Sequence, residues 1–299
     1  MDLSCYLTKR VSIEGNRATI KYAGPLLHPV TGQLALKKDD LWFGIEWDNT
    51  SRGKHNGTVS GTTYFTAAAA GNPCSLVLEK KCDMGVDILE GIVRRYFKNE
   101  EAREILEHKE NIVEVLSAKA KELESLDTKD IKTEFDDEAF IYTHGIKTKQ
   151  IQLMGFDKHW KRINMLDKTL ELGINESLVS DFGPIGNLKP LIRMVTNLSL
   201  ENNLLCNWEQ VVQLGIELPQ LEQLNLSYNK LLIPAGFEKM TNFRTLNAKS
   251  EKIECQDIKK IFPNLKMLVL LEMGLTWQKL QSLSYFFPAL ENLVNNFFF

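Results

Sequence analysis

The stretch Val195-Thr-Asn-Leu-Ser-Leu-Glu-Asn-Asn-Leu-Leu205 returns as Leu221-Glu-Gln-Leu-Asn-Leu-Ser-Tyr-Asn-Lys-Leu231, beginning 26 residues later. Both copies follow the pattern L-x-x-L-x-L-x-x-N-x-L, with valine in the first position of the first copy. A pair of amphipathic helices would need a 3.6-residue period, which these phrases lack. We therefore predict that the second half of the chain is built from repeats.

Weaker copies extend this pattern in both directions, with Glu251 and Met273 in the asparagine position of two of them. Their apolar positions are Phe243, Leu246, Ala248 and Ile253, then Leu265, Leu268, Leu270 and Leu275, with partial copies at Leu170 and Leu172 and at Leu290 and Leu293. The spacing lies within the roughly 20 to 29 residues of leucine-rich repeats. We therefore predict an α/β leucine-rich-repeat solenoid over residues 151–299, in which each turn buries its leucines against its neighbours and the asparagine bonds backbone groups of the bend.

The end of the chain reads Asn292-Leu-Val-Asn-Asn-Phe-Phe-Phe299. Solenoids normally close with a polar terminal turn, because the last leucines would otherwise face water. We therefore expect a truncated C-terminal end, a variant end or a piece of a longer chain.

Residues that alternate with the leucines are expected on the concave face. They are polar in the earlier copies and apolar in a later one, where they are Met267, Val269 and Leu271. The polar positions are Asn197, Ser199, Glu201, Gln223, Asn225, Ser227, Thr245, Asn247 and Lys249. An exposed apolar patch usually marks an interaction site, so the three apolar residues are a candidate partner contact. The alternative is that further sequence covers them.

The first half of the chain changes character near residue 83. Residues 11–78 are rich in Gly, Thr and aromatics, with short alternating runs typical of a small antiparallel β module. Residues 83–150 are strongly charged, and apolar residues recur every three or four positions from Ile105 to Leu126, which predicts an amphipathic helix. Residues 127–138 are dense in charge and read as a surface connection. We interpret 83–150 as a helical charged linker.

Three phrases lie close together in the β module: Leu41-Trp-Phe-Gly-Ile-Glu-Trp-Asp48, Arg52-Gly-Lys-His-Asn-Gly57 and Gly61-Thr-Thr-Tyr-Phe65. The glycines permit a tight loop, and the aromatics offer a flat apolar groove. Together the phrases resemble the CAP-Gly family over residues 7–82. The resemblance implies a small antiparallel β barrel.

The resemblance also implies a ligand, a C-terminal tail of the Glu-Glu-Tyr or Glu-Glu-Phe type, as on α-tubulin and end-binding proteins. Lys54, which is held on a loop between glycines, would then bind carboxylates together with His55 and Asn56. The family usually has Asn-Asp at these last two positions. The expected groove comprises Trp42, Phe43, Trp47, Gly53, Lys54, His55, Asn56, Gly57, Phe65 and Leu76, where Leu76 stands in place of a family phenylalanine. For Trp47, a position in the barrel core is equally compatible with the sequence.

The order of modules, together with phrases such as Ile151-Gln-Leu-Met-Gly-Phe156 and Gly274-Leu-Thr-Trp277, resembles the cofactor E family of tubulin-folding chaperones. That family's C-terminal ubiquitin-like domain is expected to be missing here. The resemblance implies a cytoplasmic, cytoskeleton-associated binding protein that captures α-tubulin. It implies action in assembly and dissociation of the αβ heterodimer with β-tubulin and the tubulin-folding cofactors B, C and D.

Two other function classes remain open. A microtubule-end or cytoskeletal adaptor would use the CAP-Gly groove alone, and an enzyme would need convergent ionisable groups that the sequence does not display. The chain has 36 Lys and Arg against 39 Asp and Glu and is 43% hydrophobic, which disfavours a generally basic nucleic-acid binder. No long apolar run predicts a membrane span, and the five cysteines show no metal-ligand spacing, so we expect no metal, no cofactor, no nucleic acid and no membrane partner.

Overall fold

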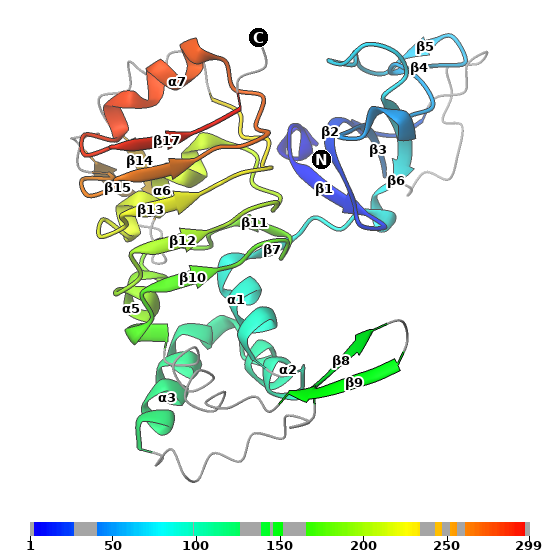
Figure 1. The fold of residues 1–299 in the computed structure, drawn as a ribbon. Helices are drawn as coiled ribbons and strands as arrows, with labels where there is room; N and C mark the ends of the chain where they lie inside the picture. The colour runs from blue at the N-terminus through cyan, green and yellow to red at the C-terminus, as the bar shows by residue number, and fades with distance from the viewer. Residues whose placement is uncertain are drawn as a thin grey trace.

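The computed structural model describes residues 3–26, 41–97, 99–125, 139–143, 146–151, 166–233, 243–246, 252–255 and 261–296. Figure 1 shows an N-terminal β module beside a stack of parallel strands, with a group of helices at the lower end of the stack. Among the described residues, no helix is both long and apolar enough to cross a membrane.

The N-terminal module is a four-stranded antiparallel sheet. Its order is β1 (Arg10–Ile13), β2 (Asn16–Gly24), β3 (Trp42–Trp47) and β6 (Cys74–Leu78), with a small hairpin of β4 (Thr58–Val59) and β5 (Thr62–Thr63) and the 3-10 turns Ser4–Tyr6, Thr50–Arg52 and Glu79–Lys81. Glu14 and Gly15 join β1 to β2 with φ of 51° and 76°, the positive values that a two-residue hairpin turn requires. Alternating residues of the strands, among them Ile20 and Ile45, form a core separate from that of the rest of the chain.

The second half contains a five-stranded parallel sheet. Its strands are β10 (Glu171–Gly173), β12 (Asn197–Ser199), β13 (Gln223–Asn225), β16 (Met267–Val269) and β17 (Asn292–Val294). The predicted inward leucines occupy one row across the sheet, in the order Leu172, Leu198, Leu224, Leu268 and Leu293. The first four are at most 3% exposed, whereas Leu293 on the last strand is 40% exposed.

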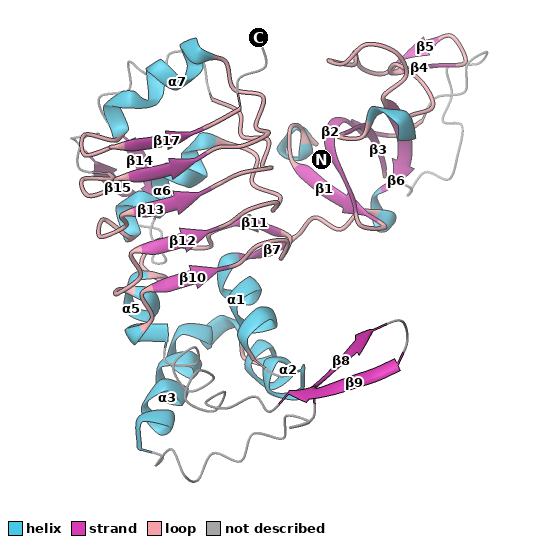
Figure 2. Ribbon diagram, in the orientation of Figure 1, coloured by secondary structure: helices cyan, strands magenta, loops and turns pink. Residues whose placement is uncertain are grey.

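The helices α5 (Lys189–Ile192), α6 (Trp208–Glu217) and α7 (Trp277–Leu283) alternate with these strands along the chain, and Figure 2 shows α5 near the lower strands and α7 at the upper end of the stack. Helix α6 begins with a capping box, in which Asn207 accepts from the backbone of Gln210 and Gln210 accepts in return. Its buried face, including Trp208, packs with the leucines in one continuous core. Short 3-10 turns at Leu166–Lys168 and Ser284–Phe286 complete this half.

The asparagines of the two strongest copies bond backbone groups, as the sequence predicts. Asn203 and Asn229 are fully buried. The Asn203 amide donates to the carbonyls of Ile174 and Leu200 at 2.7 and 3.0 Å, and its oxygen accepts from the Val179 amide at 3.0 Å. The Asn229 oxygen accepts in turn from the amide of Asn203 at 3.1 Å. Each asparagine therefore ties its own bend to the preceding turn.

The copy predicted around residues 243–253 departs from the repeat pattern. Strand β13 pairs directly with β16, while β14 (Phe243–Leu246) and β15 (Lys252–Cys255) form a separate antiparallel pair. Thr245 is therefore not part of the predicted concave row, and residues 247 and 249 lie outside the described residues. The sequence of this copy carries Glu251 in the asparagine position.

The first part of the region interpreted as a helical charged linker is helical, but its helices pack on the repeats. Helices α1 (Ile88–Tyr96), α2 (Asn99–Glu107) and α3 (Ile112–Ser125) bury apolar residues in the same core as the repeat leucines. The single helix predicted from 105 to 126 is broken by a 3-10 turn at Lys109–Asn111, and β7 (Val86–Asp87) pairs in parallel with β11 (Val179–Asp181). The helices thus cover the first turn of the parallel sheet.

The remainder of that region is described only in part. Strands β8 (Ala139–Thr143) and β9 (Ile146–Ile151) form an antiparallel hairpin within the range predicted to be helical. The surface connection predicted at 127–138 lies outside the described residues.

Candidate functional site

The loop from Gly53 to Gly57 in the β module, called the glycine loop below, has no room for a side chain at either glycine. A Cβ on Gly53 would lie 1.9 Å from the carbonyl oxygen of Asn72, and one on Gly57 would lie 2.0 Å from that of Phe65. Gly57 also has a φ of +102°, which side chains rarely adopt. The motif glycines therefore fix the loop against two neighbouring segments.

Lys54 and Asn56 are the outward-facing residues of this loop. The backbone amide of Lys54 donates to the carbonyl of Cys74 at 2.7 Å, while the Lys54 side chain is exposed. Asn56 is exposed too, and its side-chain oxygen accepts from the Thr58 amide at 3.2 Å. A cation and an amide are thus held at the surface by a fixed backbone, which suits recognition of carboxylates.

His55 faces the inside of the loop. Its Nδ1 accepts from the Gly57 amide at 3.0 Å, so the proton of the neutral ring is on Nε2. Nε2 is buried and has no hydrogen-bond partner among the described residues. Burial lowers the pKa of His55, which keeps the ring neutral near pH 7. The centroid of the Phe65 ring lies 6.3 Å away.

The structure separates the predicted aromatic residues into two sets. Phe43 and Trp47 are 0% and 6% exposed, and the indole of Trp47 donates to Ser75 Oγ at 3.0 Å. These two belong to the barrel core, which is the alternative left open for Trp47 and differs from the groove position expected for Phe43. Trp42, Phe65 and Leu76 are half-buried and remain candidates for contact.

Gly44 brings two of these candidates together. A Cβ on Gly44 would lie 2.2 Å from the Phe65 ring, and Gly44 pairs with Leu76 across β3 and β6. Tyr22 and Tyr64 extend the aromatic surface, with ring centroids 5.2 Å apart. The sequence analysis did not name these tyrosines as site residues, although Tyr64 belongs to the quoted G-x-x-Y-F phrase.

Glu46 is a further residue that the sequence analysis missed. It is 9% exposed, and its Oε1 accepts from the amides of Ala68 and Ala69 at 2.9 and 2.7 Å. Lys21 lies 3.3 Å from its other oxygen. Glu46 therefore fixes the loop that follows Phe65. Its only sequence signal is a carboxylate within an otherwise apolar strand.

The second candidate surface lies on the parallel sheet. Met267, Val269 and Leu271 are half-buried on or just after β16. Val294 pairs with Val269 on the neighbouring strand and is 42% exposed, so the apolar patch continues onto β17. The two site regions belong to separate modules, and the structure does not bring their side chains together.

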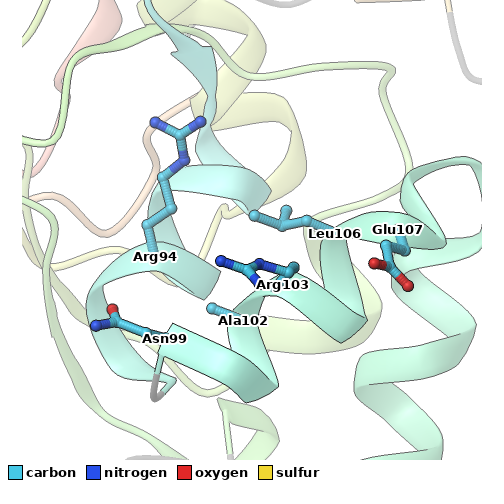
Figure 3. Close-up of a pocket in the computed structure, with 6 residues that line it drawn as sticks. All are labelled: Arg94, Asn99, Ala102, Arg103, Leu106 and Glu107. Carbon is cyan, nitrogen blue, oxygen red and sulfur yellow. The ribbon is translucent and has the colours of Figure 1, made fainter.

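A further pocket of about 420 Å³ lies among the helices. Figure 3 shows Arg94 extending from α1, and Arg103, Leu106 and Glu107 from α2. Arg94 is already ion-paired with Glu90. None of the residues that line this pocket belongs to a site predicted from the sequence.

The described residues contain no group of three or more His, Cys, Asp or Glu side chains placed to hold a metal ion. Burial, reinforced by Glu46, raises the pKa of Cys74 to about 11. Burial also raises the pKa of Cys82 to about 11. Both thiols therefore stay protonated at neutral pH and are poor nucleophiles.

Comparisons with known proteins match the N-terminal module to a domain family and nearly the whole chain to curated relatives. The family model of the CAP-Gly domain matches residues 7–82. The chain is 30% identical to "Tubulin-specific chaperone E" of Bos taurus over 287 residues, which is 95% of this chain and 42% of the relative. It is 29% identical to the Homo sapiens protein of that name over 97% of this chain and 44% of the relative. It is 26% identical to "Tubulin-folding cofactor E" of Arabidopsis thaliana over 92% of this chain and 40% of the relative.

The chain spans less than half the length of these curated relatives. No solved structure matches it significantly. The likeness covers the CAP-Gly domain and nearly all of the sequence that follows. The chain therefore carries a CAP-Gly domain and is a relative of the tubulin-specific chaperone E proteins.

Proposed function

We propose that this chain is a non-enzymatic tubulin-folding chaperone that binds α-tubulin and takes part in assembly and dissociation of the αβ heterodimer. The observation that carries this proposal is the extent of the likeness to proteins named tubulin-specific chaperone E, which covers 97% of the chain in the human case. β-Tubulin and the tubulin-folding cofactors B, C and D are the further partners that we propose. The cytoplasm and the cytoskeleton are the corresponding location.

The groove of the CAP-Gly domain supports a specific mode of binding. Lys54 and Asn56 would pair with the carboxylates of an acidic tail, and the terminal aromatic ring would lie against Phe65 and Leu76. A flat apolar surface beside an exposed cation favours such an acidic, aromatic peptide. Gly53, Gly57 and His55 would hold the loop in place, and Trp42 would border the groove.

The parallel sheet supports a second contact. We infer that it is a leucine-rich-repeat solenoid, because its strands, inward leucines and buried asparagines recur in register. The patch of Met267, Val269, Leu271 and Val294 would then meet an apolar part of the partner's folded body. Contiguous exposed apolar surface usually marks such a site.

A cytoskeletal adaptor is the second candidate function. The exposed Lys54 loop favours it, because the loop could bind an acidic tail on a polymer or an end-binding protein without help from the repeats. Such an adaptor would bind microtubules or tail peptides as well as it binds free tubulin.

Size-exclusion chromatography at low salt tests the proposal with soluble αβ-tubulin and with tubulin whose C-terminal tails have been removed. We expect co-elution with intact tubulin that weakens on tail removal and in the Lys54→Glu variant. Lys80→Glu is the matched control, because Lys80 is exposed in the same module outside the groove. Absence of co-elution with intact tubulin would contradict the chaperone assignment, and binding to polymer alone would favour the adaptor.

A further inference from the structure

The carboxylate of Asp48 joins the β module to the parallel sheet. Arg10 on β1 donates to Asp48 Oδ1 at 2.7 Å, and its second terminal nitrogen donates to Oδ2. Lys230, in the segment that follows β13, places its Nζ 3.1 Å from Oδ1 of the same carboxylate. Asp48 is therefore shared by an arginine of its own module and a lysine of the repeats.

A second contact lies on the neighbouring strand of the module. Arg17 on β2 donates to the backbone carbonyl of Asn202, which follows β12. The space beside this contact is a cavity of about 610 Å³, bordered by Arg17 and Lys81 of the module and by Glu176 and Asn202 of the repeats. The module thus meets two successive turns of the repeat stack.

The covalent connection is short and also fixed. Ser12 and Asp83 exchange backbone hydrogen bonds of 2.9 and 2.8 Å, and Val86 already belongs to β7, which pairs with β11. Between them, a Cβ on Gly85 would lie 2.3 Å from the carbonyl oxygen of Leu178. The connection therefore offers little freedom while the docked contacts hold.

Docking leaves the glycine loop accessible. Figure 1 shows β4 and β5, which follow that loop, on the side of the module away from the repeat stack. The surface that contacts the repeats, formed by β1, β2 and Asp48, is distinct from the surface around Lys54 and Phe65.

We propose that Asp48 is a positioning residue, which with Lys230 and Arg17 fixes the CAP-Gly domain on the repeats so that both surfaces bind one partner molecule at once. This inference rests on the proposed function. The partner that fits is a globular protein with a flexible, acidic, aromatic C-terminal tail, whose body meets the repeats while its tail enters the groove. The second contact is intramolecular because both surfaces belong to one chain, and such coupling strengthens binding by roughly a hundredfold or more when the geometry lets both engage together.

The test uses the full chain and separates the contact between the modules from tail binding in the groove. Lys230→Glu places a carboxylate beside Asp48, and the double variant with Arg17→Met also removes the second contact. Asp48 itself is left unchanged, because its loss would leave the buried guanidinium of Arg10 without its counter-charge and could unfold the module. Lys266→Glu is the matched control, since the Lys266 side chain is 48% exposed against 50% for Lys230 and, among the described residues, its ion pair is with Glu222 of the repeats.

Three readouts decide the outcome: affinity for an acidic, aromatic tail peptide, affinity for the whole αβ-tubulin dimer, and the maximum dimension from small-angle X-ray scattering. We expect unchanged peptide affinity, a roughly tenfold or greater loss of dimer affinity in the double variant, and a larger maximum dimension. The Lys266→Glu control should match the unmodified chain. Unchanged dimer affinity or unchanged scattering in the double variant would overturn the inference. Failure of the unmodified chain to bind the peptide would instead contradict the groove assignment, and with it the joint binding.

Discussion

The buried asparagine of each strong repeat copy is the residue on which its bend depends. Replacing Asn203 with alanine removes the acceptor of the Val179 amide and the donor to the Ile174 carbonyl, both buried. Buried polar groups left unpaired cost about 1–3 kcal/mol each, so we expect Asn203→Ala to lower the free energy of unfolding by about 2–4 kcal/mol. Urea unfolding followed by circular dichroism measures the loss.

The control for this substitution is Asn197→Ala. Asn197 lies on the exposed side of the sheet and bonds Glu171 at 3.2 Å, so we expect a change of about 0.5 kcal/mol or less. Equal losses in the two variants would show that the buried amide has no special part in stability.

Glu217 makes stability depend on pH. It is 2% exposed on α6, and burial raises its pKa, although the amides of Leu188, Gly186 and Lys189 partly oppose the shift. A carboxyl whose pKa is raised by folding contributes stability that is present at low pH and is lost as pH rises through the folded-state pKa. We therefore expect the unfolding free energy of the unmodified chain to fall, relative to Glu217→Gln, as pH rises above the ordinary glutamate pKa of about 4.3.

Chemical denaturation of both chains at several pH values measures this difference. Glu209→Gln is the control, because Glu209 is on the same helix but exposed. Two parallel pH profiles for the unmodified chain and Glu217→Gln would contradict the prediction.

At the scale of elements, two glycines near the β4–β5 hairpin should differ in how much stability the module loses when each is replaced. Gly57 and Gly61 both have positive φ, but a Cβ on Gly57 meets the Phe65 carbonyl at 2.0 Å, whereas one on Gly61 meets nothing within 4 Å. We expect Gly61→Ala to cost about 1 kcal/mol of module stability and Gly57→Ala to cost clearly more, with loss of tail binding. Near-ultraviolet circular dichroism and titration with a tail peptide compare the two variants. Equal stability and equal peptide affinity of Gly57→Ala and Gly61→Ala would contradict the prediction.

The elements also show what the sequence could and could not specify. The leucine spacing predicted the strands at Leu198, Leu224 and Leu268. The L-x-L phrase places one inward leucine at a fixed position of each strand, and this is enough to locate the strand. The prediction failed around Leu246, where similar apolar spacing belongs to a strand of a separate antiparallel pair. Periodicity detected apolar positions such as Ile105, but it could not say that their apolar face packs on the repeat core.

The backbone of the loop from Gly53 to Gly57 was predictable to a similar degree. Gly53 and Gly57 have one physical explanation, a backbone that admits no Cβ, so their role could be inferred. Trp47 is a residue type that serves equally in cores and in grooves, and only the fold distinguishes the two. The ion pair between Lys230 and Asp48 joins residues far apart in the sequence, and no local sequence pattern indicates it.

At the scale of the whole molecule, the contact between the modules should respond to acid. Burial of Asp48 would raise its pKa, but the hydrogen bond and charge of Arg10 and the charge of Lys230 outweigh burial and lower it. A carboxyl whose pKa is lowered by folding contributes stability above its unfolded-state pKa and loses it as pH falls through the folded value. We expect the docked arrangement to persist from neutral pH to below the ordinary pKa of an aspartate.

Small-angle scattering across an acid titration measures this. The Lys230→Met variant should open at a higher pH than the unmodified chain, because its Asp48 has lost a cation. Identical titrations of the two chains would show that Lys230 does not hold the modules together.

The asparagine bonds between turns also constrain how the chain is made. The side-chain oxygen that completes the bend at Val179 comes from Asn203, and the one that bonds Asn203 comes from Asn229, 26 residues further along. While the chain emerges from the ribosome, each turn therefore lacks a partner for a buried amide until the next turn has been synthesised. The buried amides of these repeats should consequently become protected from hydrogen exchange in steps, each turn only after the next one has been synthesised.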